Sequence, residues 1–187
     1  MRAYPCFPSG KVRQAVIDEQ GLKTLVSQLA SDISRRNRGV KNLVFVGIKR
    51  RGVPLANRLA KELSLNQKYR IPVGAIDITL YRDDLQLVAE TPICGGSEID
   101  FDINGRIIVL VDDLIYTGRT VRAALTELLD FGRPKSIQLA VLVDRGHREL
   151  PIEPNFVGRT IKTRHDDLVD IYLVEEDGTD GVFLTRR

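Results

Sequence analysis

The pattern of apolar and polar residues switches between two periods along most of the chain. Short apolar runs rich in β-branched residues occupy 43–48 and 107–111. Such runs are typical of strands that are buried on both faces of a sheet. Apolar residues at helical spacing predict helices over about 18–37, from Gly52 and Pro54 onward, and again after Thr120.

Further apolar runs predict additional strands at 72–80, 136–143, 168–174 and 182–184. Strands that alternate with helices imply an α/β fold around a mainly parallel sheet. A chain of 187 residues is long enough for one compact domain with a substantial core. We therefore expect a loose leader over 1–11, a single domain over 12–187, and a flexible loop over the polar stretch at about 82–104.

Composition narrows the class of protein only slightly. Hydrophobic residues make up 43% and charged residues 28%, which is an ordinary balance for a globular protein. The net charge of +3 is compatible with anionic ligands or nucleic acid but requires neither. Cys6 and Cys94 lack the spacing of a metal site, and we expect a reducing, cytoplasmic location. The sequence contains neither a signal peptide nor an apolar stretch of membrane-spanning length.

The densest cluster of candidate chemistry follows the apolar run at 107–111. Asp112 and Asp113 stand at its carboxyl end, and the turn 117–120 then leads into a helix. N–H groups of such a turn favour a phosphate, while paired carboxylates suit ribose hydroxyls or a hard cation such as Mg²⁺. Each feature alone is common as a solvated loop or a helix cap. Their combination at a strand end, where open α/β sheets bind ligands, favours a site.

Three more charged clusters follow predicted strands and should lie near the same sheet edge. Arg50 and Arg51 can form bidentate phosphate contacts, and Gly52 permits a close backbone approach. Arg82, at the root of the long loop, can close over a diphosphate. His147 lies in the third cluster, 144–148, but a single histidine without a partner motif does not establish a general base. Each cluster can alternatively be an ordinary solvated turn.

These residues carry a resemblance to a known family. Residues 109–121 resemble the phosphoribosyl-diphosphate (PRPP) signature of the type I phosphoribosyltransferases. The strings 46–49, 76–84 and 139–151 resemble more narrowly the bifunctional pyrimidine operon regulators within that superfamily. The resemblance covers about 12–175 and implies a mainly parallel sheet flanked by helices, a small hood and a long flexible loop.

The resemblance also implies a reaction and a role for each site residue. Uracil and PRPP would give UMP and diphosphate, through a transition state resembling a ribosyl oxocarbenium ion. Asp112 and Asp113 would bind the ribose hydroxyls and position Mg²⁺ directly or through water. The diphosphate would meet Arg50, Arg51, Gly52 and Arg82, and uracil would be framed by Arg145 and Val169. The remainder of the PRPP site would comprise Leu114, Ile115, Tyr116, Thr117, Gly118, Arg119 and Thr120, with the last four at the 5′-phosphate.

Tyr116 bears on the choice of base. Purine-using relatives of this motif generally carry an acid at the corresponding position, where it meets a purine ring nitrogen. A tyrosine hydroxyl is a poor proton acceptor at neutral pH. We therefore expect uracil, and neither hypoxanthine nor guanine, to support turnover.

The resemblance further implies regulation by transcriptional attenuation. A homodimer or higher homo-oligomer would sense UMP or UTP and bind pyrimidine operon leader mRNA through a basic face. Candidates for that face are Arg35, Arg36, Arg38, Arg148, Arg159, Lys162, Arg164 and His165. A solvated, mildly basic surface explains the same residues.

This chain departs from the family pattern at several positions. Gln28, Ser31 and Ser34 stand in the first helix, where regulatory members are richer in arginine and histidine. Arg50 replaces a usual threonine, and 162–167 differs from a serine-rich string. Two alternatives therefore stay open: a uracil phosphoribosyltransferase without RNA regulation, and a nucleotide-binding sensor with negligible turnover.

Overall fold

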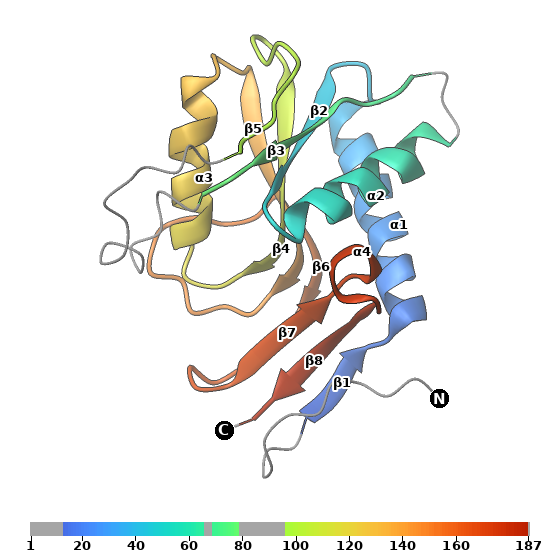
Figure 1. The fold of residues 1–187 in the computed structure, drawn as a ribbon, viewed down its shortest axis with the longest axis vertical. Helices are drawn as coiled ribbons and strands as arrows, with labels where there is room; N and C mark the ends of the chain where they lie inside the picture. Colours follow the sequence, from blue (N-terminus) through green and yellow to red (C-terminus); the bar gives the residue numbers. More distant parts are fainter. Residues whose placement is uncertain (1–12, 66–68, 79–95, 187) are drawn as a thin grey trace.

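A five-stranded parallel sheet forms the centre of the molecule in the computed structural model, which describes residues 13–65, 69–78 and 96–186 (Figure 1). The strand order is β3-β2-β4-β5-β6. The strands span β2 (Leu43–Ile48), β3 (Val73–Ile76), β4 (Ile107–Ile115), β5 (Ser136–Asp144) and β6 (Phe156–Thr160). Because all neighbouring pairs are parallel, every carboxyl end lies at the same edge of the sheet.

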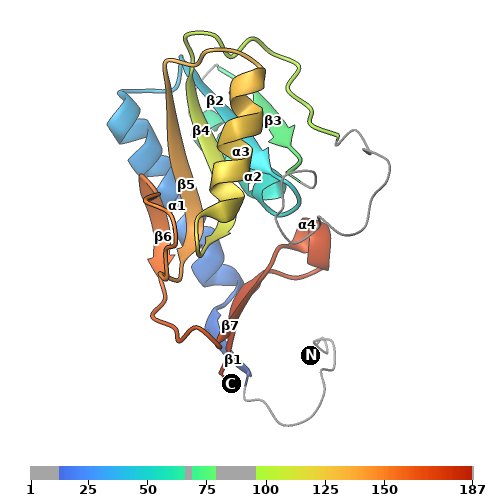
Figure 2. The ribbon, with the colours of Figure 1, turned by 90° about the vertical axis from the view of Figure 1, so that its left-hand side faces the viewer.

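Helices cover both faces of this sheet. Helices α1 (Glu19–Asn37) and α2 (Gly52–Ser64) pack on one face, and α3 (Arg119–Asp130) packs on the other. Figure 2 shows α1 and α3 on opposite sides of the strands. Side chains of β4 alternate between the two cores, with Val109 and Val111 facing α1 and α2 while Ile108 and Leu110 face α3. The predicted α/β fold is confirmed.

A second, antiparallel sheet lies beyond the carboxyl ends of the parallel strands (Figure 1). It joins β1 (Arg13–Ile17), β8 (Gly181–Thr185) and β7 (Leu168–Tyr172) in the order β1-β8-β7. The short helix α4 (Val174–Asp177) connects β7 to β8. We call these four elements the hood. The sequence pattern did not predict β1, β6 or α4.

Local sequence signals explain the limits of α1. Asp18 caps its amino end, because its Oδ1 accepts a hydrogen bond from the N–H of Gly21 at 2.8 Å. The buried residues of the helix, Leu22, Val26, Leu29, Ala30 and Ile33, form its predicted apolar stripe. The helix ends at Arg38, which adopts φ 54° and directs its N–H at the carbonyls of Ser34 and Arg35.

Ion pairs fasten the hood to α2. The guanidinium of Arg58 donates two hydrogen bonds to the carboxylate of Asp180, at 2.8 and 2.7 Å, and also pairs with Glu175. Asp180 is buried, with a side chain only 5% exposed. These bonds hold the hood above the sheet edge at which the candidate site lies.

The described end of the polar stretch, residues 96–104, packs against the body of the protein. The backbone of Glu98 exchanges two hydrogen bonds of 2.8 Å with Ala75, and Ile103 is buried against the α3 face. Residues 96–104 thus form irregular structure that packs against β3 and the α3 face. The flexible loop over about 82–104 stays a prediction. Alternation of Ile99, Phe101 and Ile103 with acidic residues was the signal for this packing. The rest of the loop, the predicted leader, Cys6 and Cys94 lie outside the described residues.

The strand β4 is longer than the apolar run predicted. It continues through Ile115, so Asp112 and Asp113 lie within the strand and not after it. Parallel hydrogen bonding to β5 extends to the pair Ile115 and Asp144. The acidic pair is thus held on a rigid element. Among the described residues no helix has the length and apolar character needed to cross a membrane.

Candidate active site

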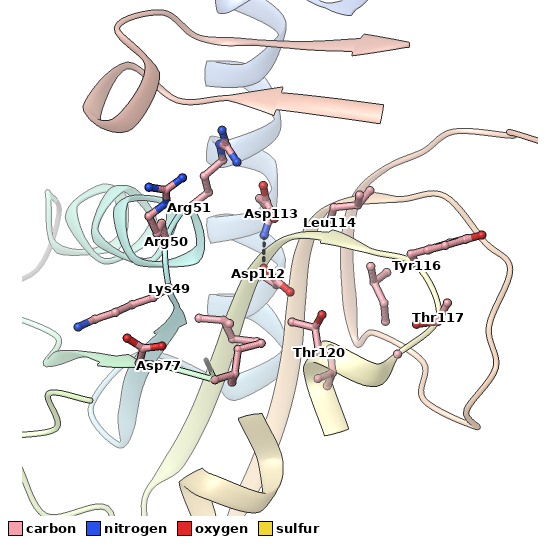
Figure 3. Close-up of a pocket in the computed structure, with 15 residues that line it drawn as sticks. Lys49, Arg50, Arg51, Asp77, Asp112, Asp113, Leu114, Tyr116, Thr117 and Thr120 are labelled. Carbon is pink, nitrogen blue, oxygen red and sulfur yellow. Dashed lines mark hydrogen bonds between the residues drawn. The ribbon is translucent and has the colours of Figure 1, made fainter. Parts of the chain in front are cut away.

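A cavity of about 840 Å³ opens at the carboxyl ends of β2, β3 and β4 (Figure 3). In Figure 3 the basic side chains that follow β2 lie on one side, Tyr116 and Thr117 lie on the other, and the acidic pair lies between them. Three segments supply the lining: Ile48, Lys49, Arg50 and Arg51; Asp77 and Ile78; and Asp112 to Thr117 with Gly118, Thr120 and Val121. The fold therefore brings together most of the predicted PRPP site.

The acidic pair has unusual electrostatics. Asp112 is 6% exposed, and its Oδ1 accepts a hydrogen bond from the N–H of Asp113 at 2.9 Å. Burial raises the pKa of Asp112 well above its ordinary value, and the charge of Asp113 raises it further. Burial also raises the pKa of Asp113, against the opposing charge of Arg51. Two negative charges are therefore unfavourable here unless a ligand or cation stabilises them.

The turn 117–120, which follows β4, is held by hydrogen bonds from the segment that follows β5. Its residue Gly118 has φ 91°, a left-handed conformation that favours glycine, and α3 begins at the next residue. The carbonyl of Thr117 accepts hydrogen bonds from the N–H groups of Glu149 and Leu150 at 3.0 and 3.1 Å. The side chain of Arg119 pairs with Glu149 and does not line the cavity. Its predicted phosphate contact can therefore involve only the backbone in this arrangement.

The three basic residues 49–51 all line the cavity, but one of them is also bound to the hood. A cis peptide bond joins Lys49 to Arg50, and both side chains line the cavity. Arg51 also lines it, but its guanidinium donates two hydrogen bonds to Asp177 of the hood, at 3.0 and 2.8 Å. These bonds hold the pKa of Asp177 below its ordinary value. A diphosphate would therefore compete with Asp177 for Arg51, whereas Arg50 is exposed.

The structure changes the interpretation of Gly52. A Cβ atom at this position would lie 2.4 Å from the carbonyl oxygen of Val111, and one at Gly47 would lie 2.5 Å from the Cα of Val53. Both glycines therefore allow the start of α2 to pack closely on the sheet. Gly52 does not line the cavity, so its predicted direct role at the diphosphate is not supported. Lys49 and Asp77, which do line it, were missing from the predicted site.

The two predicted base-binding residues, Arg145 and Val169, lie outside the lining of the cavity. The guanidinium carbon of Arg145 lies 4.3 Å from the centre of the Tyr116 ring, and the residue is only 7% exposed. Its Nη2 donates to the carbonyls of Arg164 and Asp167 at 3.0 and 2.8 Å. Val169 is half-buried in β7. Neither residue lines the cavity, and Arg82 lies outside the described residues.

One RNA-binding candidate is internal. The side chain of Arg148 is 14% exposed, and it donates to Asp144 at 2.6 Å, to the carbonyl of Tyr116 at 3.0 Å and to that of Ile152 at 3.0 Å. These contacts hold the turn 117–120 in place, and Arg148 is the least exposed of the predicted RNA-binding residues. Its role as an RNA contact stays a prediction. The exposed candidates are Arg35, Arg36, Arg38, Arg159, Lys162, Arg164 and His165.

Comparison with known proteins agrees with this geometry. The family model of the phosphoribosyl transferase domain matches residues 14–169. A hypoxanthine-guanine phosphoribosyltransferase from Bacillus anthracis has the same fold, with a TM-score of 0.70 at 19% identity over 93% of this chain and 98% of that chain. A Trypanosoma cruzi hypoxanthine phosphoribosyltransferase gives a TM-score of 0.70 at 20% identity, covering 92% and 94%. Fold and site thus define a phosphoribosyltransferase-class protein.

Sequence relatives narrow the class. The Bifunctional protein PyrR of Roseiflexus sp. (strain RS-1) is 51% identical over 172 residues, which cover 91% of this chain and 94% of the relative. That of Clostridioides difficile (strain 630) is 50% identical over 167 residues, covering 89% and 94%. The chain belongs to the PyrR family, which confirms the resemblance seen in its sequence.

Proposed function

We propose that this protein transfers the phosphoribosyl group of PRPP to uracil, giving UMP and diphosphate, and regulates pyrimidine operon expression by binding leader mRNA. The observation that carries the enzymatic part is the cavity itself. A buried acidic pair lies between a phosphate-type turn and a basic loop, in a member of the PyrR family. No other described cavity of the chain combines these groups with parallel strand ends.

The geometry supports a separate role for each group of residues that lines the cavity. The carboxylates of Asp112 and Asp113 accept hydrogen bonds from ribose hydroxyls, and in Figure 3 they diverge, with Asp113 directed toward the hood. The turn 117–120 holds the 5′-phosphate through its N–H groups. Arg50 meets the departing diphosphate from the opposite side, and Lys49 lies next to it with its ammonium paired to Glu98 at 3.1 Å. Catalysis then consists of positioning the base against the sugar and neutralising the leaving group.

The residues present fit Mg²⁺ bound together with PRPP. In the described part of the chain, no group of three or more His, Cys, Asp or Glu side chains could hold a metal by itself. Asp112 and Asp113 offer oxygen ligands whose raised pKa values would fall beside a cation. Mg²⁺ commonly combines one or two carboxylates with substrate phosphates. Bound there, it would neutralise charge on the diphosphate, with Asp112 or Asp113 holding it directly or through water.

The choice of base is tested by a panel of acceptors. With PRPP and Mg²⁺, we expect uracil to release diphosphate at a rate at least about 100-fold above hypoxanthine and guanine. Tyr116 lines the cavity at the position where purine-using relatives generally carry an acid. Diphosphate release is followed with a coupled phosphate assay. Turnover with hypoxanthine in the absence of turnover with uracil would contradict the proposal.

A basic edge of the sheet supports the regulatory part. β6 is one of the two edge strands of the parallel sheet, and α1 packs beside it (Figure 2). Arg36 of α1 lies 5.7 Å from the ring centre of Phe156 in β6, and Arg159 of β6 borders a groove of about 520 Å³ lined by Thr24 and Gln28. Arg35 and Arg38 are exposed at the carboxyl end of α1, and Lys162 and Arg164 are exposed in the connection that follows β6. We propose that RNA phosphates bind along this basic edge.

Exchanging both Arg36 and Arg159 for alanine is expected to lower the affinity for the leader RNA. The affinity of this variant should also depend less steeply on the salt concentration. Each lost phosphate contact lowers the slope of log affinity against log salt by about 0.7 for single-stranded RNA. Filter binding over a salt series, with and without UMP, measures that slope. The matched control exchanges Arg133 and Lys135, which are exposed in the α3–β5 connection. If wild-type protein binds the leader no better than a shuffled RNA, the regulatory part fails.

A further inference from the structure

The two histidines of this chain lie together against the cavity wall. They are 18 residues apart in sequence, yet Nδ1 of His147 lies 3.2 Å from Nε2 of His165, and their ring centres are 4.1 Å apart. The hydroxyl of Tyr116 lies 3.2 Å from Nδ1 of His165. At the other end, Nε2 of His147 lies 2.8 Å from the carbonyl oxygen of Thr163.

These contacts form a chain with one consistent order of protons when both imidazoles are neutral. A carbonyl oxygen only accepts, and the Thr163 hydroxyl, 3.2 Å from the same nitrogen, donates to the carbonyl of Arg145. Nε2 of His147 therefore donates to the Thr163 carbonyl. Its Nδ1 is then an acceptor, and Nε2 of His165 must donate to it. Nδ1 of His165 is left as an acceptor for the Tyr116 hydroxyl. Both histidines are therefore fixed in the Nε2–H tautomer.

The chain connects two parts of the protein that are far apart in sequence. Tyr116 follows β4 and lines the cavity, whereas His165 belongs to the exposed connection between β6 and β7. Arg145 holds that connection from below through the carbonyls of Arg164 and Asp167, and its guanidinium also packs on the Tyr116 ring. The Tyr116 side chain is thus fixed by a cation on its face and by a histidine at its hydroxyl.

We propose that His165 is a positioning residue for the base end of the cavity, which it serves by holding the Tyr116 side chain through this hydrogen-bonded chain. The inference rests on the proposed function, since the base is the ligand expected beside Tyr116. The backbone of Tyr116 is held independently, because its carbonyl accepts a hydrogen bond from Arg148. His165 therefore orders the wall at the base and leaves the phosphate turn in place.

The test exchanges His165 for phenylalanine, which keeps a ring beside His147 but cannot hydrogen-bond. We expect the KM for uracil to rise about tenfold, as for the loss of one ordered hydrogen bond, with kcat and the KM for PRPP within about twofold of wild type. His165→Gln should restore the KM for uracil, because an amide offers a donor and an acceptor at similar spacing. Asp166→Asn, an exposed neighbour, is the matched control. Equal effects on both substrates, or no effect, would overturn the proposal.

A second measurement is independent of turnover. Long-range ¹H–¹⁵N correlation spectra of the wild-type protein contain only two imidazoles and report their tautomers directly. When both imidazoles are neutral we expect the Nε2–H form at each, with His147 perturbed in the His165→Phe variant. An Nδ1–H tautomer at either residue would overturn the hydrogen-bonded chain. Absence of uracil turnover in a wild-type protein with the expected spectrum would instead overturn the proposed function and, with it, the role at the base.

Discussion

Exchanging Asp112 for asparagine is expected to lower uracil turnover by at least about 100-fold, since the variant loses a charged ligand for ribose and Mg²⁺. The same change should make the ligand-free protein more stable at neutral pH. Burial, assisted by the charge of Asp113, makes ionisation of Asp112 unfavourable in the folded state. An asparagine keeps the acceptor for the N–H of Asp113 without carrying a charge.

The pH dependence of this stability gain has a defined sign. The folded-state pKa of Asp112 lies above its unfolded value, so the folded protein binds the proton more tightly. The wild type therefore loses stability from this group as the pH rises from the ordinary aspartate range through the raised pKa. The gain in the Asp112→Asn variant should be full above that raised pKa and should fade toward acid pH.

Urea unfolding at several pH values measures the effect, alongside diphosphate release at neutral pH. Asp130→Asn, at an exposed position of α3, is the control and should change neither quantity. An Asp112→Asn protein that retains wild-type turnover, or that is less stable than wild type at neutral pH, would contradict the role assigned to the acidic pair.

The second large effect concerns the attachment of the hood. Exchanging Arg58 for methionine should reduce the free energy of unfolding by about 3 kcal/mol, because it leaves the buried carboxylate of Asp180 without its partner. Asp180→Asn in the same protein should recover part of the loss, since the amide keeps the acceptor for the N–H of Val174 and carries no charge. Urea unfolding of both single variants and the double variant gives the coupling between the residues.

The dependence of stability on acid pH provides an additional check on the ion pairs of Arg58. Hydrogen bonds from Arg58 hold the pKa of Glu175 below its ordinary value. The stability that this pair contributes is therefore present above the ordinary glutamate pKa and is lost as the pH falls through the lowered one. The Arg58→Met variant should lack this component. Lys61→Met, one turn along α2 and exposed, is the control, and an Arg58→Met protein as stable as that control would contradict the role of the pair.

The sequence predicted those elements whose pattern is set locally. The strands β2 and β4 are apolar because helices cover both faces of the sheet, and α1 has a side-chain cap and a continuous apolar stripe. β1 and β6 are short edge strands with exposed residues, so neither shows a strong period. Their pairing depends on partners distant in sequence, and no local pattern specifies that pairing.

In the candidate site, too, the sequence predicted the features that are local and missed those that depend on distant residues. Asp112, Asp113 and the turn 117–120 were predictable because strand, acids and helix start follow one another in sequence. The hydrogen-bond partners of the arginine side chains were not predictable from the sequence. Arg148 turns inward to Asp144, Arg51 binds Asp177 of the hood, and Arg119 pairs with Glu149. An arginine in a basic cluster has the same sequence signature whether its guanidinium faces solvent, a ligand or a carboxylate.

The most direct test of the central proposal is to follow the conversion of labelled uracil to UMP by the wild-type protein with PRPP and Mg²⁺. The account predicts UMP and diphosphate in equal amounts, with both products reduced to the level of a protein-free blank when Asp112 and Asp113 are exchanged together for asparagine. A folded wild-type protein that forms no UMP, or a double variant that forms as much as the wild type, would contradict it.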